Sequence, residues 1–507
     1  MEFYELFYKW VPVYVRIPVL TLLYFLLLTA NGIYLGTTAD MSSGLGVYTE
    51  PYTMAYYAMY IGMGLGSMTN LRIRERFTAK SLLLFGLVTM VLMNIVCATT
   101  NNPYVTILAC LVLGMGKVSA STEIYLVWLQ VWSKKLDVSR LYPFVYFIAL
   151  GGTYSMTWLD SRLAYLFDWR HAYIIILMLL LVAIILAVIF VENHPLKRKV
   201  PLYQMDTLGS ILMVSFLMLI NYILVYGKVE DWWESSRIKL ASIGALVVLS
   251  LLLKRELSFK RPVFPLDLFK LPNFRIGFLY FLMLGIFVPT TLQASFTSGT
   301  LHYENFRNYE LSLYMIPGVT AGVSLCFYWF YQGYHLQLLM TCGFITVIIY
   351  EVIMYMSFGN AFALKGFWLT SVIKGFGLAI LYTSIGIYMT RGHTIKDVLT
   401  VVGIAFISRS FLGTAIFTSL YNYFIYAQRI RHLSYLGGLI DSSAANQTGT
   451  ASADMYATLQ SQAGLAAEKE LTGYVILVGI AFTLILFISV IVDWERTYFN
   501  KPASNGT

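Results

Sequence analysis

The chain has 507 residues, of which 58% are hydrophobic and 12% charged, and its formal net charge is +9. Soluble proteins are about half apolar and about a quarter charged, so this composition excludes a soluble globular class as well as disordered and fibrous chains. The basic residues stand in short clusters between apolar runs, which predicts a membrane-orientation signal rather than a nucleic-acid-binding surface.

Apolar runs of about twenty residues recur along the chain, the length at which a helix crosses a hydrocarbon core of roughly 30 Å. The runs are continuous rather than alternating, which favours helices over barrel strands, and the first is predicted to be a retained span rather than a signal peptide. In chain order we predict fourteen transmembrane helices, at about 17–38, 51–70, 81–100, 104–131, 142–166, 172–192, 206–226, 237–253, 276–299, 310–331, 336–358, 363–390, 398–421 and 471–492.

The clusters of Lys and Arg favour one side of the membrane. Most of them, including the cluster at 72–76, fall in the segments on the same side as both termini. The positive-inside rule therefore predicts a multi-pass protein of the cell inner (plasma) membrane with both termini in the cytoplasm. The longest segment on the other side, 422–470, is rich in small polar residues, and we expect a flexible loop with a short amphipathic helix in its later part.

Several loop sequences resemble one family. The loop 261–269 reads Arg-Pro-Val-Phe-Pro-Leu-Asp-Leu-Phe, the helix at 206–226 opens with Asp206-Thr207-Leu208-Gly209, and the helix at 363–390 contains Lys374-Gly375-Phe376-Gly377. These stretches resemble the fourteen-span drug/proton antiporters (EmrB/QacA type) of the major facilitator superfamily, and the resemblance covers nearly the whole chain.

The resemblance implies an all-α integral membrane protein with the major facilitator fold and 14 transmembrane helices. It implies an N-terminal six-helix bundle at 1–200, an extra two-helix insert with a basic cytoplasmic loop at 201–275, and a C-terminal six-helix bundle at 276–507 that carries the long extracytoplasmic loop 422–470. The implied function is proton-coupled efflux of lipophilic or amphipathic compounds by alternating access, without a cofactor. The implied partners are small-molecule substrates, protons, membrane lipid and, in double-membrane bacteria, a periplasmic adaptor protein and an outer-membrane channel.

The chain departs from the family pattern in the loop after the second predicted helix. The superfamily's Gly-x-x-x-Asp-Arg-x-Gly-Arg loop reads Gly66-Ser67-Met68-Thr69-Asn70-Leu71-Arg72-Ile73-Arg74 here, so Asn70 stands where the family has an acid, and Arg76 extends the basic loop. The helix at 104–131 likewise has Cys110 and Leu113 where drug antiporters carry Arg and Gln. The basic loop either latches one conformation or only fixes the topology, and the usual proton-coupling residues are missing.

Two acids inside predicted spans are candidates for proton coupling, because a charged group in lipid is costly and normally faces a partner or a cavity. Glu123 shares a face with Ser119 and Gln130, whereas Lys117, six residues away, lies about 600° around the same helix. Glu123 either exchanges protons or pairs with a basic residue of a neighbouring helix. Asp160 is either a coupling site or a solvated group near the outer end of its helix.

The remaining intramembrane polar residues are candidates for a substrate cavity or for internal charge pairs; they are Lys117, Asn31, Gln130, Glu351, Lys374 and Arg409. An alternative function uses the basic residues among them to transport a specific metabolite or organic anion. A cavity of aromatic and Met side chains with one acid would favour cationic or lipophilic compounds, and a basic cavity would favour anions.

A membrane enzyme or scaffold without transport is a further alternative. The sequence disfavours it, because the chain has neither a phosphate-binding Gly-Lys-Ser/Thr loop nor a metal-type spacing of its histidines. We therefore predict no catalytic residue and no metal site.

Overall fold

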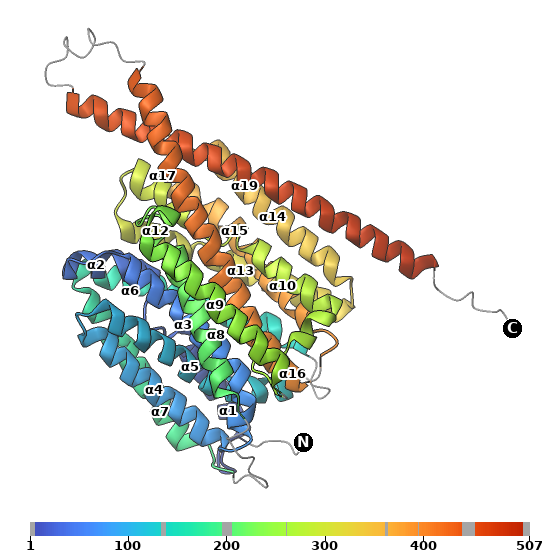
Figure 1. The fold of residues 1–507 in the computed structure, drawn as a ribbon. Helices are drawn as coiled ribbons and strands as arrows, with labels where there is room; N and C mark the ends of the chain where they lie inside the picture. Colours follow the sequence, from blue (N-terminus) through green and yellow to red (C-terminus); the bar gives the residue numbers. More distant parts are fainter. Residues whose placement is uncertain are drawn as a thin grey trace. The chain divides into compact units, whose positions relative to one another are not determined.

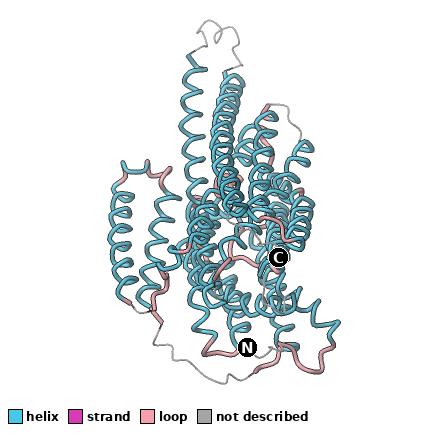
Figure 2. Tube along the Cα trace, turned by 90° about the vertical axis from the view of Figure 1, so that its right-hand side faces the viewer, coloured by secondary structure: helices cyan, strands magenta, loops and turns pink. Residues whose placement is uncertain are grey.

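The computed structural model describes residues 6–132, 138–194, 205–259, 261–359, 364–393, 395–438 and 452–499. In this part of the chain the regular structure is helical, apart from an isolated antiparallel β-bridge between Phe7 and Val191 (Figure 2). The contacts divide the chain into two units. Unit 1 comprises Met1–Pro289, Glu304–Leu313 and Gly386–Asn422, and unit 2 comprises Thr290–Tyr303, Tyr314–Ile385 and Tyr423–Thr507.

Unit 1 holds most of the helices labelled in Figure 1. They are α1 (Val13–Thr29), α2 (Thr38–Leu45), α3 (Glu50–Arg74), α4 (Ala79–Thr99), α5 (Pro103–Trp132), α6 (Tyr142–Leu166), α7 (Trp169–Phe190), α8 (Thr207–Tyr226), α9 (Ser236–Ser258), α10 (Pro272–Leu284), α12 (Asn305–Leu313), α16 (Ile395–Ala405) and the π-helix Phe406–Gly413. The last residues of α15 (Phe367–Thr390) and the first of α17 (Thr414–Gly438) also belong to this unit.

Unit 2 is built from the C-terminal part of the chain. It contains α11 (Thr291–Ala294), the π-helix Ser295–Thr300, α13 (Met315–Gln332), α14 (Leu336–Ser357), most of α15, the later part of α17 and α19 (Ser452–Phe499).

Short polar side chains set where several helices begin. Asp168 and Ser235 accept hydrogen bonds from backbone N–H groups at the starts of α7 and α9. The Asp206 Oδ1 accepts a hydrogen bond of 2.9 Å from the backbone N–H of Gly209, and it forms an ion pair with Arg255, whose Nε lies 3.1 Å away. A β-carbon at position 209 would overlap the Asp206 carboxylate, so this close approach explains the Asp-x-x-Gly sequence at the start of α8.

Glycines allow the closest helix contacts in both units. In unit 1 a β-carbon on Gly62 of α3 would overlap the Leu111 carbonyl of α5, and one on Gly114 of α5 would overlap the Met59 carbonyl of α3. In unit 2 Gly318 of α13 and Gly375 of α15 approach each other's helix in the same way. These glycines therefore serve close backbone packing.

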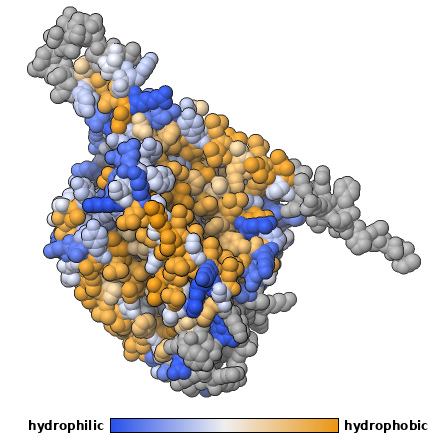
Figure 3. Space-filling model, viewed as in Figure 1, coloured by the Kyte–Doolittle hydropathy of each residue, from blue (hydrophilic) through white to orange (hydrophobic). Residues whose placement is uncertain are grey.

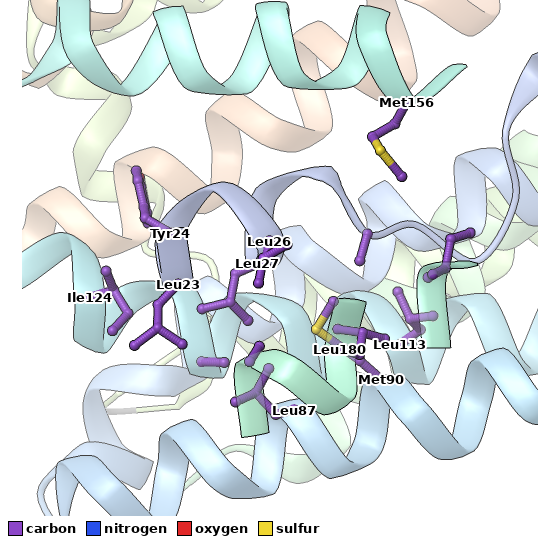
Figure 4. Packing of buried hydrophobic residues seen from close by; sticks show 14 of the residues in the cluster. Leu23, Tyr24, Leu26, Leu27, Leu87, Met90, Leu113, Ile124, Met156 and Leu180 are labelled. Carbon is purple, nitrogen blue, oxygen red and sulfur yellow. The ribbon is translucent and has the colours of Figure 1, made fainter. Parts of the chain in front are cut away.

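The apolar core of unit 1 is built around α1. Figure 4 shows Leu23 and Leu27 of α1 beside side chains of α4, α5 and α7, among them Leu87, Leu113 and Leu180. All five of these leucines are completely buried. Close van der Waals contact among these side chains, rather than exclusion of water, fixes a transmembrane helix such as α1 against its neighbours.

The outer surface of several helices is apolar. The most apolar stretch of α9 is only 17% buried inside the protein, against 67% for α5, and Figure 3 shows broad hydrophobic areas on the visible face. Among the described residues ten helical segments are long and apolar enough to cross a membrane, and Val13–Thr29 is a shorter apolar helix. The total of fourteen crossings stays a prediction.

Three segments differ from the helices expected from the sequence. The predicted helix 17–38 is interrupted, because α1 ends at Thr29, Ala30 has an extended backbone, and regular structure resumes only at Leu35. The predicted helix 276–299 is broken, because α10 ends at Leu284 and is followed by turns up to Pro289, which cannot donate a backbone hydrogen bond. The expected outer loop 422–470 is largely helical in its described part, since α17 continues to Gly438 and α19 begins at Ser452. Residues 439–451, which cover most of the predicted flexible stretch, lie outside the described residues.

Candidate functional site

An interior cavity of about 110 Å³ lies within unit 1. Its lining comes from two distant stretches of sequence, 24–149 and 386–409. Aromatic and methionine side chains dominate it: Tyr24, Tyr125, Tyr142, Tyr146, Phe406, Met63 and Met389. Among the described residues that line the cavity, Arg409 is the one charged side chain. Such a lining suits a solute with a flat apolar body and few polar groups.

Arg409 enters this cavity from a π-helix, a rare conformation that often occurs at functional sites. Its Nη1 donates a hydrogen bond of 2.7 Å to the hydroxyl of Tyr146. The guanidinium also lies 5.1 Å from the ring centres of both Tyr146 and Phe406. Cation–π contacts stabilise a guanidinium in a desolvated place, so the surrounding rings hold the Arg409 charge beside the cavity.

Lys117 is buried where α1 ends, with a relative exposure of 3%. Its Nζ donates hydrogen bonds to the carbonyls of Leu28 and Ala30, at 2.7 and 3.2 Å, and to Asn31 Oδ1 at 2.5 Å. The structure therefore brings together Lys117 and Asn31, which the sequence marked separately. Leu28 and Val118 line the cavity, so this cluster adjoins it.

Asp160 lies on α6 in the interior of unit 1, and none of its surface is exposed. Neither of its carboxylate oxygens has a hydrogen-bond partner among the described residues. This burial disagrees with the alternative that Asp160 is a solvated group near the outer end of its helix. Buried polar groups normally have hydrogen-bond partners, so packing alone does not explain a carboxylate at this position.

Glu123 is 2% exposed and pairs with Arg74 of α3. Arg74 Nε lies 3.0 Å from Oε1 and donates a hydrogen bond to Oε2 at 3.3 Å. This geometry agrees with a structural pair between Glu123 and a basic residue of a neighbouring helix. Thr122, next to Glu123, lines the cavity, whereas Glu123 itself does not.

The other residues of the predicted loop motif have separate environments. Gly66 packs against the backbone of Met115 on α5. Asn70 is completely buried, and neither polar atom of its side chain has a partner among the described residues. Arg72 is 3.9 Å from Glu75 on the surface, and Arg76 is exposed. Among the described residues, Arg74 is thus the one arginine of this loop that forms an ion pair with a buried carboxylate.

The remaining candidates lie outside the cavity. Gln130 of α5 is half-buried and is absent from the cavity lining. Glu351 of α14 and Lys374 of α15 are both buried in unit 2. Lys374 Nζ also lies 4.8 Å from the ring centre of Tyr350. The internal charge pair expected for Glu351 stays a prediction. Among the described residues no group of three or more His, Cys, Asp or Glu could hold a metal ion.

Two features of the interior went unnoticed in the sequence. Tyr142 and Tyr146 stand four residues apart inside one predicted span, a spacing that places both on one helix face and could have indicated a cavity lining. Glu468 was assigned to an outer loop, but it is 1% exposed on α19. Its carboxylate accepts hydrogen bonds from Ser295 and Thr300 of the π-helix in unit 2.

Comparison with known proteins identifies the class. A model of the Major Facilitator Superfamily matches residues 20–418. The chain therefore belongs to the major facilitator superfamily, and it is a multi-pass integral membrane transporter rather than an enzyme.

The individual proteins that resemble this chain share little sequence identity with it. The methylenomycin A resistance protein of Bacillus subtilis (strain 168) is 23% identical over 247 residues, which are 48% of this chain and 50% of that protein. The match thus spans about half the length of this curated relative.

Solved structures share the fold. The human organic anion transporter MFSD10 aligns with 94% of this chain and 100% of its own, at 13% identity and a TM-score of 0.53. The tetrameric PepTSo2 aligns with 96% of this chain and 100% of its own, at 14% identity and a TM-score of 0.57. A structure of proton-dependent oligopeptide transporters covers 95% of this chain and 100% of its own, at 14% identity and a TM-score of 0.58.

Proposed function

We propose that this chain is a secondary transporter that exports lipophilic or amphipathic compounds in exchange for protons by alternating access. The observation that carries the proposal is the cavity lined by tyrosines, methionines and Phe406. Aromatic faces bind flat apolar bodies, and methionine adapts to differently shaped ones, so such a lining tolerates a range of solutes. The similarity to a methylenomycin A resistance protein supports export.

The finer features of the proposal follow the resemblance to the fourteen-span drug/proton antiporters. They include both termini in the cytoplasm and, in a double-membrane bacterium, a periplasmic adaptor and an outer-membrane channel as partners. The helical extensions of α17 and α19 would be the contact for an adaptor. Asp160, which is completely buried, remains the first carboxylate candidate for proton coupling, and Glu123 the second.

A second candidate function is transport of organic anions. It is favoured by Arg409, the one charged side chain among the described residues that line the cavity. A guanidinium with five N–H donors binds carboxylates in a fixed geometry. The two functions overlap for a solute that has an aromatic body and one acidic group.

The test uses three naphthalene compounds that differ mainly in charge: the anion naphthalene-1-acetate, the neutral naphthalene-1-acetamide and the cation 1-naphthylmethylamine. Each is presented to purified protein in proteoliposomes with and without an imposed pH gradient. Gradient-driven transport of the neutral and cationic compounds supports broad efflux, and transport of the anion alone supports the second candidate. If none of the three moves faster than in protein-free liposomes, transport of amphipathic aromatic solutes is wrong.

Two variants examine the coupling acids. Asp160→Asn and Glu123→Gln remove one negative charge each while keeping the size of the side chain. We expect Asp160→Asn to weaken the dependence of transport on the gradient more than Glu123→Gln, because Glu123 already pairs with Arg74. Unchanged proton dependence in both variants would show that neither acid couples transport.

A further inference from the structure

The first helix of the chain is interrupted inside unit 1. α1 ends at Thr29, Ala30 has an extended backbone (φ −71°, ψ 113°), and regular structure resumes only at Leu35. Ala30, Asn31 and Tyr34 are each 3% exposed, so this non-helical segment is buried. The last carbonyls of a helix lack partners within the helix, and in a membrane interior they need donors from elsewhere.

Lys117 supplies those donors. A lysine ammonium has three N–H groups, and the two carbonyls of Leu28 and Ala30 together with Asn31 Oδ1 provide one acceptor for each. The described residues place no carboxylate within 4.0 Å of Nζ. The positive charge is therefore held by oxygen dipoles at a helix C-terminus, where a cation is favoured, and not by an ion pair.

We propose that Lys117 is a further group that binds and releases a coupled proton in unit 1, beside the carboxylate candidates Asp160 and Glu123; this inference rests on the proton-coupled transport proposed above. A neutral lysine amine has two N–H donors and a lone pair. Lys117 itself does not line the cavity, so the ammonium gives its proton to a water molecule that reaches it past Leu28 and Val118. One of the three oxygens then loses its donor and faces that lone pair. Proton loss thus loosens the interrupted end of α1 against α5.

The cavity provides the link to the solute. Leu28, whose carbonyl accepts from Lys117, and Val118, the residue after Lys117, both line it. A change at the C-terminal end of α1 therefore reaches the wall of the solute site through Leu28. Discontinuous helices at the solute site are a recurring device by which transporters join ion binding to a conformational change.

Other polar groups form hydrogen bonds with the backbone of the interrupted segment at the end of α1. The Tyr34 hydroxyl donates to the Thr29 carbonyl at 2.5 Å and accepts from the Asn31 N–H at 2.9 Å, and Tyr173 of α7 donates to the Gly32 carbonyl at 2.7 Å. The titratable groups that surround the segment are Tyr34, Tyr60, Cys97, Cys110, Asp160 and Tyr173. Lys117 is the one basic side chain among the described groups that bond to the segment.

The first experiment measures transport. Naphthalene-1-acetamide is followed in proteoliposomes in two modes, counterflow without a gradient and accumulation driven by a pH gradient. Lys117→Arg keeps a positive charge that cannot be lost, since a guanidinium does not deprotonate in proteins. We expect it to keep counterflow but to lose gradient-driven accumulation, down to the level without a gradient. Lys80→Arg is the control, because Lys80 donates to the Val188 carbonyl away from the cavity.

The outcome separates this inference from the proposed function. Gradient-driven accumulation by Lys117→Arg at the wild-type level overturns the role of Lys117 and leaves transport itself intact. Absence of both modes in the wild type speaks against the proposed function, and the second experiment then tests Lys117 without any solute.

The second experiment uses amide hydrogen exchange of residues 24–34 in detergent micelles. After correction for the intrinsic pH dependence of exchange, we expect protection in the wild type to fall as pH rises, because the ammonium loses a donor. In Lys117→Arg protection should stay constant. The same pH dependence in both proteins would overturn the proposal.

Discussion

The pair between Arg74 and Glu123 gives the sharpest prediction about stability. Glu123 is 2% exposed and Arg74 is 27% exposed, with 3.0 Å between Nε and Oε1. Removing one partner of a buried pair costs about 3–5 kcal/mol, because the other charge stays buried without compensation. Water partly screens Arg74, so we expect Arg74→Ala to lower the free energy of unfolding by about 2–3 kcal/mol.

Removing the acid should cost less than removing the base. Glu123→Gln leaves a neutral amide whose oxygen still accepts a hydrogen bond, so a loss of about 1 kcal/mol is expected. The double variant has no uncompensated buried charge. We therefore expect its free energy of unfolding to fall by about 1–2 kcal/mol less than the sum of the decreases in the two single variants.

The assay is reversible unfolding by sodium dodecyl sulfate in mixed micelles, followed by circular dichroism. Arg72→Ala is the matched control, since its 3.9 Å pair with Glu75 lies on the surface and should contribute less than about 1 kcal/mol. The reasoning fails if Arg74→Ala and Arg72→Ala cost the same, or if the effects of Arg74→Ala and Glu123→Gln simply add.

Three further predictions concern packing and hydrogen bonds, and unfolding in mixed micelles measures each. Gly114→Ala inserts a methyl group against the α3 backbone and should cost about 1–3 kcal/mol, whereas Gly151→Ala, with no atom within 4 Å of the new methyl, should not destabilise. Tyr146→Phe removes the acceptor of the 2.7 Å bond from Arg409 and should cost about 1.5–3 kcal/mol; a loss below 0.5 kcal/mol, on the order of an ordinary surface change, would contradict this. Gly209→Ala displaces the buried Asp206 carboxylate from the start of α8 and should cost about 2 kcal/mol; an unchanged stability would show that the overlap relaxes freely.

The sequence predicted the features that depend on composition and local spacing. Apolar runs located the helices because a membrane demands about twenty consecutive apolar residues. It also limited Glu123 to two roles. It could not identify Arg74 as the partner, because that choice depends on how α3 and α5 align in space.

The parts that could not be predicted depend on contacts between distant segments. Arg409 and Tyr146 lie 263 positions apart in the chain, and no local pattern joins them. The acceptors of Lys117 are backbone carbonyls, which carry no sequence signal at all. Glu468 was hidden because its polar neighbours suggested a loop, whereas hydroxyl groups of the π-helix Ser295–Thr300 satisfy the carboxylate within the fold.

The central claim is that solutes pass through the aromatic cavity that contains Arg409. The most direct measurement compares counterflow of naphthalene-1-acetate and naphthalene-1-acetamide by wild-type protein, Arg409→Lys and Arg409→Gln in proteoliposomes. We predict that Arg409→Gln loses counterflow of the anion at least about tenfold, since a desolvated charge contact contributes more than 1.4 kcal/mol. Counterflow of the neutral amide should persist in both variants, which also shows that they fold. Equal rates for the anion in wild type and Arg409→Gln would contradict the account.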